Sequence, residues 1–131
     1  MSRLFRWVSQ HWLPLSMLLG LLVAALSLYP LPKLPDTIGG DKLHHFIGYG
    51  AIFFPIALRQ PKGWLLFGLL IFTGSGLIEL IQPYVNRYGE WYDLFANGAG
   101  VITGGVMGSA LHYYLSQRTT KTVTLQKGDQ E

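Results

Sequence analysis

The sequence contains four long apolar stretches joined by short polar segments, all within 131 residues. A hydrocarbon core about 30 Å thick is crossed by a helix of about 20 mostly apolar residues. We therefore predict four transmembrane helices, over residues 12–29, 43–58, 63–82 and 94–115. The expected fold is all-α, an integral membrane bundle with short loops. Residues 1–115 would form one transmembrane domain, and residues 116–131 a polar, loosely ordered cytoplasmic tail.

The composition excludes several other classes of protein. Charged residues make up 13% of the chain, against about 25% in soluble domains, which argues against an ordinary soluble enzyme. The absence of cysteine excludes disulfides, zinc–thiolate sites and cysteine nucleophiles. The net charge of +3 is scattered, so we expect no nucleic-acid partner. No Walker loop, dinucleotide fingerprint or H-E-x-x-H motif occurs, and the sequence assigns no cofactor.

The first apolar stretch could also be read as a secretory signal peptide. It is longer than a typical signal core, and no small-x-small cleavage site precedes Pro30, Pro32 and Pro35. We interpret it as a retained anchor. The basic residues then set the orientation, because positive charge accumulates on the cytoplasmic side. One side carries Arg3, Arg6, Arg59, Lys62, Arg118, Lys121 and Lys127; the other carries Lys33, Lys42 and Arg87. This distribution predicts both termini in the cytoplasm, and we expect the protein to lie in the inner membrane.

Strongly polar residues gather at the predicted outer ends of the last three stretches. With a rise of 1.5 Å per residue, His45, Glu79 and Asn97 would each lie about 6 Å inside a helix end. We expect these three side chains to share one layer. The complete candidate set for an outward-facing pocket is Asp41, Lys42, His45, Glu79, Gln82, Arg87, Asp93 and Asn97.

Glu79 is the most informative of these residues. It lies near a helix C-terminus, where the macrodipole disfavours negative charge, and partly within hydrocarbon, where carboxylates are costly. It therefore needs a nearby cation or a proton. Arg87, Lys42 and His45 are the available cations, and the planar guanidinium of Arg87 suits a carboxylate best.

Each residue also has a purely structural interpretation. Asp41 and Asp93 could cap helices, and His45 could be a hydrogen-bonded core histidine. Glu79 and Arg87 could form a structural ion pair, while Gln82 and Asn97 could join helices by hydrogen bonds. The small-residue stripe of Gly100, Gly104 and Gly108 predicts close helix packing, either within the chain or in a homodimer.

The polar pattern resembles that of VanZ-like membrane proteins. The resemblance rests on Asp41-Lys42-x-x-His45-Phe46, Glu79-x-x-Gln82, Arg87 and Asp93-x-x-x-Asn97-x-x-Gly100. It implies a small multi-span protein of the cell envelope whose biochemical activity is not settled. The founding member of that family is linked to low-level resistance to the lipoglycopeptide teicoplanin, which makes glycopeptide sensitivity an expected phenotype.

Three functions follow from this pattern. The first is binding of an anionic headgroup, from a membrane lipid or a lipid-linked envelope precursor, by Asp41, Lys42, Gln82, Arg87 and Asn97. The second is an enzyme, a hydrolase or transferase acting on a lipid-linked substrate, with His45, Glu79 and Asp93 as the catalytic candidates. In that case Asp41, Glu79 and Asp93 could also hold Mg²⁺, although the sequence assigns no metal site. The third is a structural or partner protein whose polar residues only set helix packing.

Overall fold

The computed structural model describes residues 3–29, 40–85 and 89–128, with side chains described as far as Arg118. Within these ranges the chain is helical apart from short turns and contains no strand, which confirms the all-α prediction. The elements are α1 (Arg3–Gln10), α2 (Trp12–Leu28), α3 (Gly40–Arg59), α4 (Trp64–Ile81), the 3-10 helix η1 (Gln82–Val85) and α5 (Trp91–Gly128).

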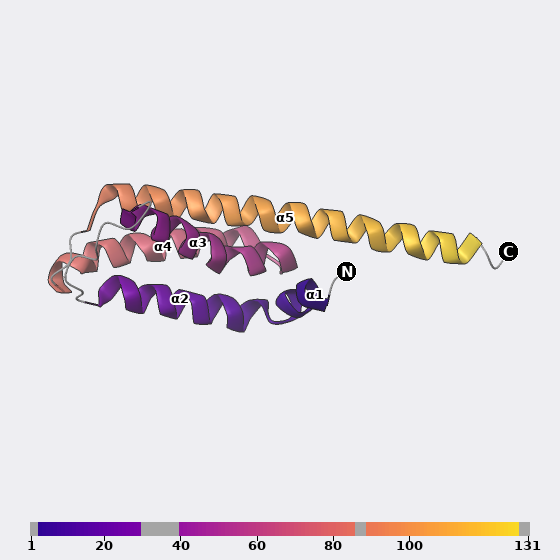
Figure 1. Cartoon of the computed structure of the whole chain (residues 1–131), viewed down its shortest axis with the longest axis horizontal. Helices are drawn as coiled ribbons and strands as arrows, with labels where there is room; N and C mark the ends of the chain where they lie inside the picture. Colours follow the sequence, from indigo (N-terminus) through magenta and orange to yellow (C-terminus); the bar gives the residue numbers. More distant parts are fainter. Residues whose placement is uncertain (1–2, 30–39, 86–88, 129–131) are drawn as a thin grey trace.

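Helices α2 to α5 run along a common long axis (Figure 1). Helices α2 and α4 end, and α3 and α5 begin, at the same end of the bundle, which we call the polar end. At the opposite end, the turn between α3 and α4 places Gly63 at a φ of 74°, a left-handed conformation that glycine adopts without strain. Helix α1 folds back at 75° to α2.

Helix α3 is the centre of the bundle and packs against α2, α4 and α5. Its inner face supplies most of the buried apolar side chains, which are Tyr49, Ile52, Phe53, Ile56, Ala57 and Leu58. Because α3 is surrounded on several sides, its residues are apolar around much of the helix rather than along one narrow stripe.

The glycine stripe of α5 makes close packing against α3 within the chain. A Cβ at Gly100 would meet the Phe46 carbonyl oxygen, and one at Gly108 would lie 2.7 Å from the Ala57 Cβ. Gly104 likewise lies directly against the Gly50 backbone. The intramolecular alternative is therefore realised. A homodimer through the same stripe stays a prediction, and it would require this contact with α3 to open.

The apolarity of the helices supports membrane insertion, but fewer helices qualify as membrane spans than the four predicted from the sequence. Two helical segments, Trp64–Val85 and Trp91–Arg118, are long and apolar enough to cross a bilayer, and the bent pair α1–α2 would make a third. Helix α2 alone has 17 residues, slightly fewer than the roughly 20 that span hydrocarbon. Helix α3 begins with Asp41, Lys42, His44 and His45, which shorten its apolar part.

Two features at the chain ends differ from our expectations. The first predicted span begins at residue 12, and the structure adds a short helix before it, α1 at Arg3–Gln10. Where we expected a loosely ordered tail, α5 continues as a helix to Gly128 and projects beyond the other helices (Figure 1). The tail lacks proline between Leu115 and Gly128, so nothing in its backbone chemistry interrupts the helix.

Candidate functional site

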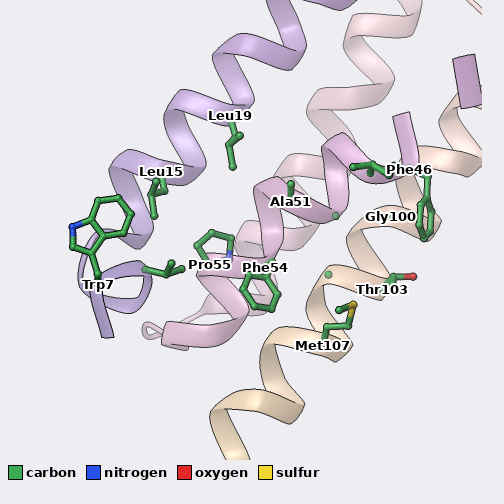
Figure 2. Close-up of a pocket in the computed structure, with 14 residues that line it drawn as sticks. Trp7, Leu15, Leu19, Phe46, Ala51, Phe54, Pro55, Gly100, Thr103 and Met107 are labelled. Atoms are coloured by element: carbon green, nitrogen blue, oxygen red, sulfur yellow. The ribbon is translucent and has the colours of Figure 1, made fainter. Parts of the chain in front are cut away.

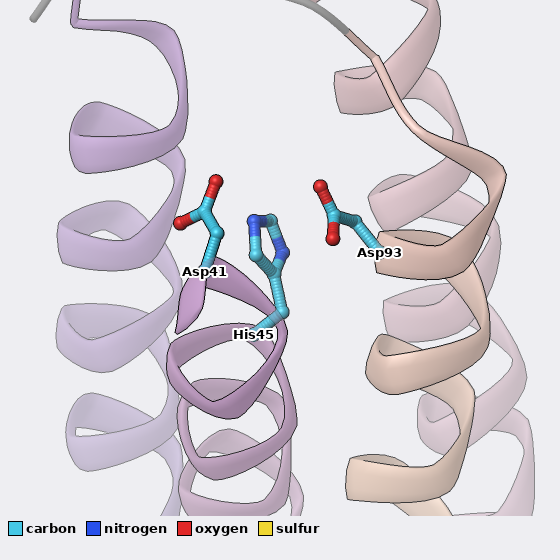
Figure 3. Close-up of side chains that lie close together, drawn as sticks. All are labelled: Asp41, His45 and Asp93. Carbon is cyan, nitrogen blue, oxygen red and sulfur yellow. The ribbon is translucent and has the colours of Figure 1, made fainter. Parts of the chain in front are cut away.

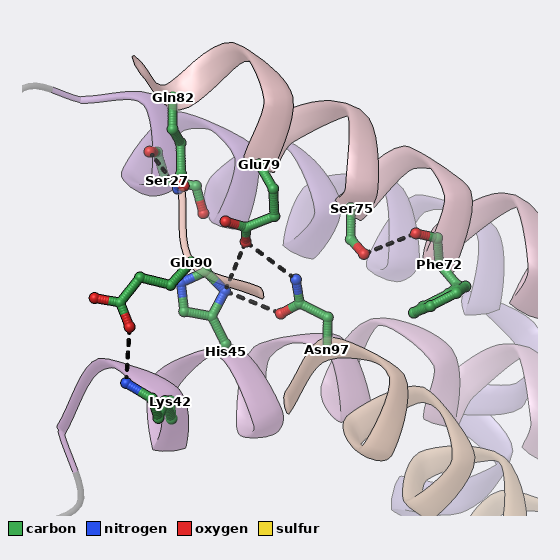
Figure 4. A network of polar contacts seen from close by, with 9 residues as sticks. All are labelled: Ser27, Lys42, His45, Phe72, Ser75, Glu79, Gln82, Glu90 and Asn97. Atoms are coloured by element: carbon green, nitrogen blue, oxygen red, sulfur yellow. Dashed lines mark hydrogen bonds and ion pairs between the residues drawn. The ribbon is translucent and has the colours of Figure 1, made fainter. Parts of the chain in front are cut away.

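A hydrogen-bonded triad joins three helices at the polar end (Figure 4). His45 of α3 lies with Nδ1 at 2.9 Å from Oδ1 of Asn97 on α5. The Asn97 amide nitrogen donates to Oε1 of Glu79 on α4, at 3.4 Å. His45 Nδ1 and Glu79 Oε1 are 3.9 Å apart. The expected shared layer of these three side chains is thus present in the fold.

The donors and acceptors of this triad determine which imidazole nitrogen carries hydrogen. When Glu79 is ionised, its oxygens only accept hydrogen bonds, so the Asn97 amide nitrogen faces Glu79 and the Asn97 oxygen faces His45. His45 Nδ1 must then donate its hydrogen to Asn97. In the neutral imidazole, the lone pair consequently lies on Nε2.

The imidazole of His45 lies between two carboxylates (Figure 3). Asp41 lies one turn before His45 on α3, and Asp93 lies in the first turn of α5. Donor atoms of Asp41, His45 and Asp93 all lie within 4.8 Å of one another. Asp41 is exposed, whereas His45 and Asp93 retain only 6% and 3% of their exposed surface. The group therefore lies at the boundary between solvent and the packed bundle.

Lys42 forms a separate ion pair with Glu90 at the polar end. Its Nζ lies 3.1 Å from Glu90 Oε2, and about half of each side chain is exposed. The hydrogen bond to Glu90 raises the pKa of Lys42 above its ordinary value of 10.5. Lys42 also lies over the Tyr92 ring, 6.0 Å from its centroid. An exposed pair of this kind contributes little stability and can exchange partners.

Gln82 lies outside the triad, although it is fully buried. Its amide nitrogen donates to the Ser27 carbonyl at the end of α2, over 3.2 Å. This contact ties α2 to the end of α4, which matches the structural interpretation of Gln82. The sequence could not identify the partner, because a backbone carbonyl has no side-chain signature.

Several buried polar atoms at this end have no hydrogen-bond partner among the described residues. They are Glu79 Oε2, Gln82 Oε1 and Asp93 Oδ1. Buried carboxylate oxygens without partners carry a desolvation cost that a stable protein normally offsets. The polar end thus carries more buried hydrogen-bond acceptors than the hydrogen bonds of the described residues use.

An apolar groove begins beside this polar end (Figure 2). Its volume is about 480 Å³. Helix α3 forms the floor, with α1 and α2 on one side and α5 on the other. Phe46 and Gly100 line it near the polar end, and Trp7 and Met107 line it farther away. No sequence pattern predicted this groove, because its residues come from four helices.

The candidate residues are therefore distributed over several neighbouring contacts. The structure brings His45, Glu79 and Asn97 into direct contact, and Asp41 and Asp93 close to His45. Lys42 pairs with Glu90, which the sequence reasoning did not include in the site. The predicted pairing of Arg87 with Glu79 lies outside the described residues.

Comparison with known proteins adds no assignment. No family model, curated protein or solved structure matches the chain. The likeness to VanZ-like proteins therefore stays an interpretation of the polar residues alone.

Proposed function

We propose that this protein is a multi-span membrane protein that binds an anionic lipid-linked envelope component, with the headgroup at the polar end and an acyl chain in the apolar groove. The observation that carries the proposal is the continuity of the two surfaces. Phe46 lines the groove, and Lys42 lies one helical turn before it on α3. An anionic lipid, which joins a charged headgroup to an apolar chain, is complementary to a cation placed beside an apolar groove.

The charges at the polar end suit a phosphate or carboxylate headgroup. The Lys42 ammonium is half exposed, and its ion-pair partner is the exposed Glu90 carboxylate. A headgroup phosphate could replace Glu90 as its partner, forming a charge-assisted hydrogen bond. The groove itself offers almost only apolar side chains, so it would receive a hydrocarbon chain rather than a polar substrate.

The orientation follows from the distribution of basic residues. Arg59 and Lys62 lie at the end of the bundle opposite to Lys42. Under the positive-inside rule, the polar end would face outward from the inner membrane, and both termini would be cytoplasmic. In this arrangement α2 to α5 are the four spans. The resemblance to VanZ-like proteins adds altered glycopeptide sensitivity as a phenotype to examine.

Binding is tested with purified protein in nanodiscs of phosphatidylcholine containing a small fraction of phosphatidylglycerol. We expect native mass spectrometry to show retained anionic lipid, and Lys42→Ala to lower that retention. Ala51→Trp, which would fill the groove, should lower it as well. Leu69→Trp is the matched control, because Leu69 is 60% exposed on α4. Equal retention by all four proteins would refute the proposal.

A second candidate, an enzyme, is favoured by the position of His45 between Asp41 and Asp93. An imidazole held in one tautomer by Asn97 and flanked by carboxylates is arranged as a general base. The reaction would be hydrolysis or group transfer on the bound lipid. Turnover of a lipid-linked substrate that disappears in His45→Gln, while lipid retention persists, distinguishes this candidate from binding alone.

The remaining alternative is a non-catalytic structural or partner protein, in which the polar residues only set helix packing. It predicts that Lys42→Ala changes neither lipid retention nor stability, because the Lys42–Glu90 pair is exposed. A change in lipid retention without a change in melting temperature therefore argues against this alternative.

A further inference from the structure

We propose that Asp41, His45 and Asp93 form a binding site for a divalent transition-metal ion such as Zn²⁺ or Mn²⁺. The three donor groups come from α3 and from the start of α5, and their donor atoms lie within 4.8 Å of one another. Figure 3 shows the two carboxylates on either side of the imidazole. The proposal concerns the metal alone and does not depend on lipid binding.

The first argument is the tautomer of His45. Metal-bound histidines usually donate their other ring hydrogen to an oxygen, which fixes the ring and makes the coordinating nitrogen more basic. Asn97 supplies this oxygen, since its Oδ1 lies 2.9 Å from His45 Nδ1. Glu79 in turn accepts from the Asn97 amide and holds it in place. Nε2 therefore carries the lone pair and is available to bind a metal ion.

The second argument is an unpartnered oxygen. Asp93 is 3% exposed, and its Oδ1 has no hydrogen-bond partner among the described residues. A carboxylate oxygen of Asp41 lies within 4.8 Å of one of Asp93, so the two negative charges repel each other. A divalent cation between Asp41, His45 and Asp93 would satisfy this oxygen and remove the repulsion between the two aspartates.

The donor set indicates the class of metal. The imidazole suits zinc and related transition metals, and the two carboxylates also suit Mn²⁺, whereas magnesium and calcium prefer oxygen ligands alone. Donors bound tetrahedrally to one zinc lie about 3.4 Å apart, given metal–ligand lengths near 2.1 Å. A rotation of the exposed Asp41 side chain could bring the three donors to that spacing. Three protein ligands would leave a position open to water or to an oxygen of a bound anion.

The experiment uses untagged full-length protein in phosphatidylcholine nanodiscs, stripped with a chelator and then dialysed. Zinc and manganese are added separately, and binding is measured by calorimetry and by the electron paramagnetic resonance signal of Mn²⁺. We expect about one ion per chain, and a loss of affinity of at least 10-fold in Asp41→Asn and His45→Ala. Asp41 is exposed, so its variant should fold normally.

His44→Ala is the matched control, because His44 is an exposed histidine adjacent to the site and is not among the three ligands. It should bind the metal as the wild type does. Absence of binding to the wild type would overturn the proposal, and so would equal binding by wild type, Asp41→Asn and His45→Ala. Folding of every variant is verified by circular dichroism. Should His45→Ala fail to fold, Asp41→Asn against His44→Ala decides the matter.

Discussion

His45 Nδ1 lies 2.9 Å from Asn97 Oδ1, which joins two residues 52 positions apart in the chain. This contact fixes the rotation of α5 relative to α3 at the polar end. It also holds the imidazole so that its other nitrogen can face the Asp41 and Asp93 carboxylates. One hydrogen bond thus links the packing of the bundle to the chemistry available at its polar end.

Replacing Asn97 should destabilise the protein. Asn97 is fully buried, and Asn97→Ala would leave both His45 and Glu79 without its hydrogen bonds. We expect a loss of about 1–3 kcal/mol in the free energy of unfolding, the cost of leaving buried polar groups unsatisfied. Chemical denaturation in detergent micelles measures it. Thr73→Ala, at an exposed site on α4, should change stability by less than about 0.5 kcal/mol. Equal effects of the two substitutions would contradict this role of Asn97.

The glycine stripe gives a second prediction about stability. In Gly108→Ala the new methyl group would lie 2.7 Å from the Ala57 Cβ and 2.8 Å from the Phe54 carbonyl oxygen. Backbone atoms cannot move aside cheaply, so α3 and α5 must separate, at a cost of about 1–3 kcal/mol. Gly74→Ala is the control, because nothing lies within 4 Å of its added Cβ. It should be neutral or slightly stabilising, since alanine favours helices. The melting temperature should therefore fall in Gly108→Ala and stay unchanged or rise slightly in Gly74→Ala.

The sequence predicted the all-α class and the contact among His45, Glu79 and Asn97. Apolar runs mark the helices, and the rise per residue sets the depth of each polar side chain below its helix end. The sequence also placed the helix ends of α2 and α4 within about two residues, where prolines and charges interrupt the apolar runs. It missed the Lys42–Glu90 pair and the Ser27 carbonyl as the partner of Gln82. Those contacts depend on the rotation of each helix about its own axis. Helices that are apolar around most of their surface have no periodic pattern from which this rotation can be predicted. The shape of the groove depends on the same helix rotations.

The membrane topology can be tested directly because the chain contains no cysteine. Gln60→Cys lies in the turn between α3 and α4. Tyr84→Cys lies in η1, directly after α4, and replaces a side chain that is 88% exposed. If α4 crosses the membrane, a membrane-impermeant maleimide added to intact bacterial spheroplasts should label only one of the two. We expect labelling of Tyr84→Cys, on the outer side, and labelling of Gln60→Cys only after lysis. Labelling of both variants before lysis would exclude this arrangement of α4.

The ion pair of Lys42 and Glu90 should produce a small alkaline pH dependence of stability. The pKa of Lys42 is raised in the folded protein, chiefly by its hydrogen bond to Glu90, so folding favours the protonated amine. The contribution is complete below the ordinary pKa of 10.5 and is lost as the pH rises through the higher pKa of the folded state. Because both side chains are half exposed, added salt should weaken the effect. Melting temperatures of wild type and Glu90→Gln, measured on both sides of that pH, should differ below it and converge above it. A constant difference across the alkaline range would show that Glu90 acts through contacts other than the Lys42 charge.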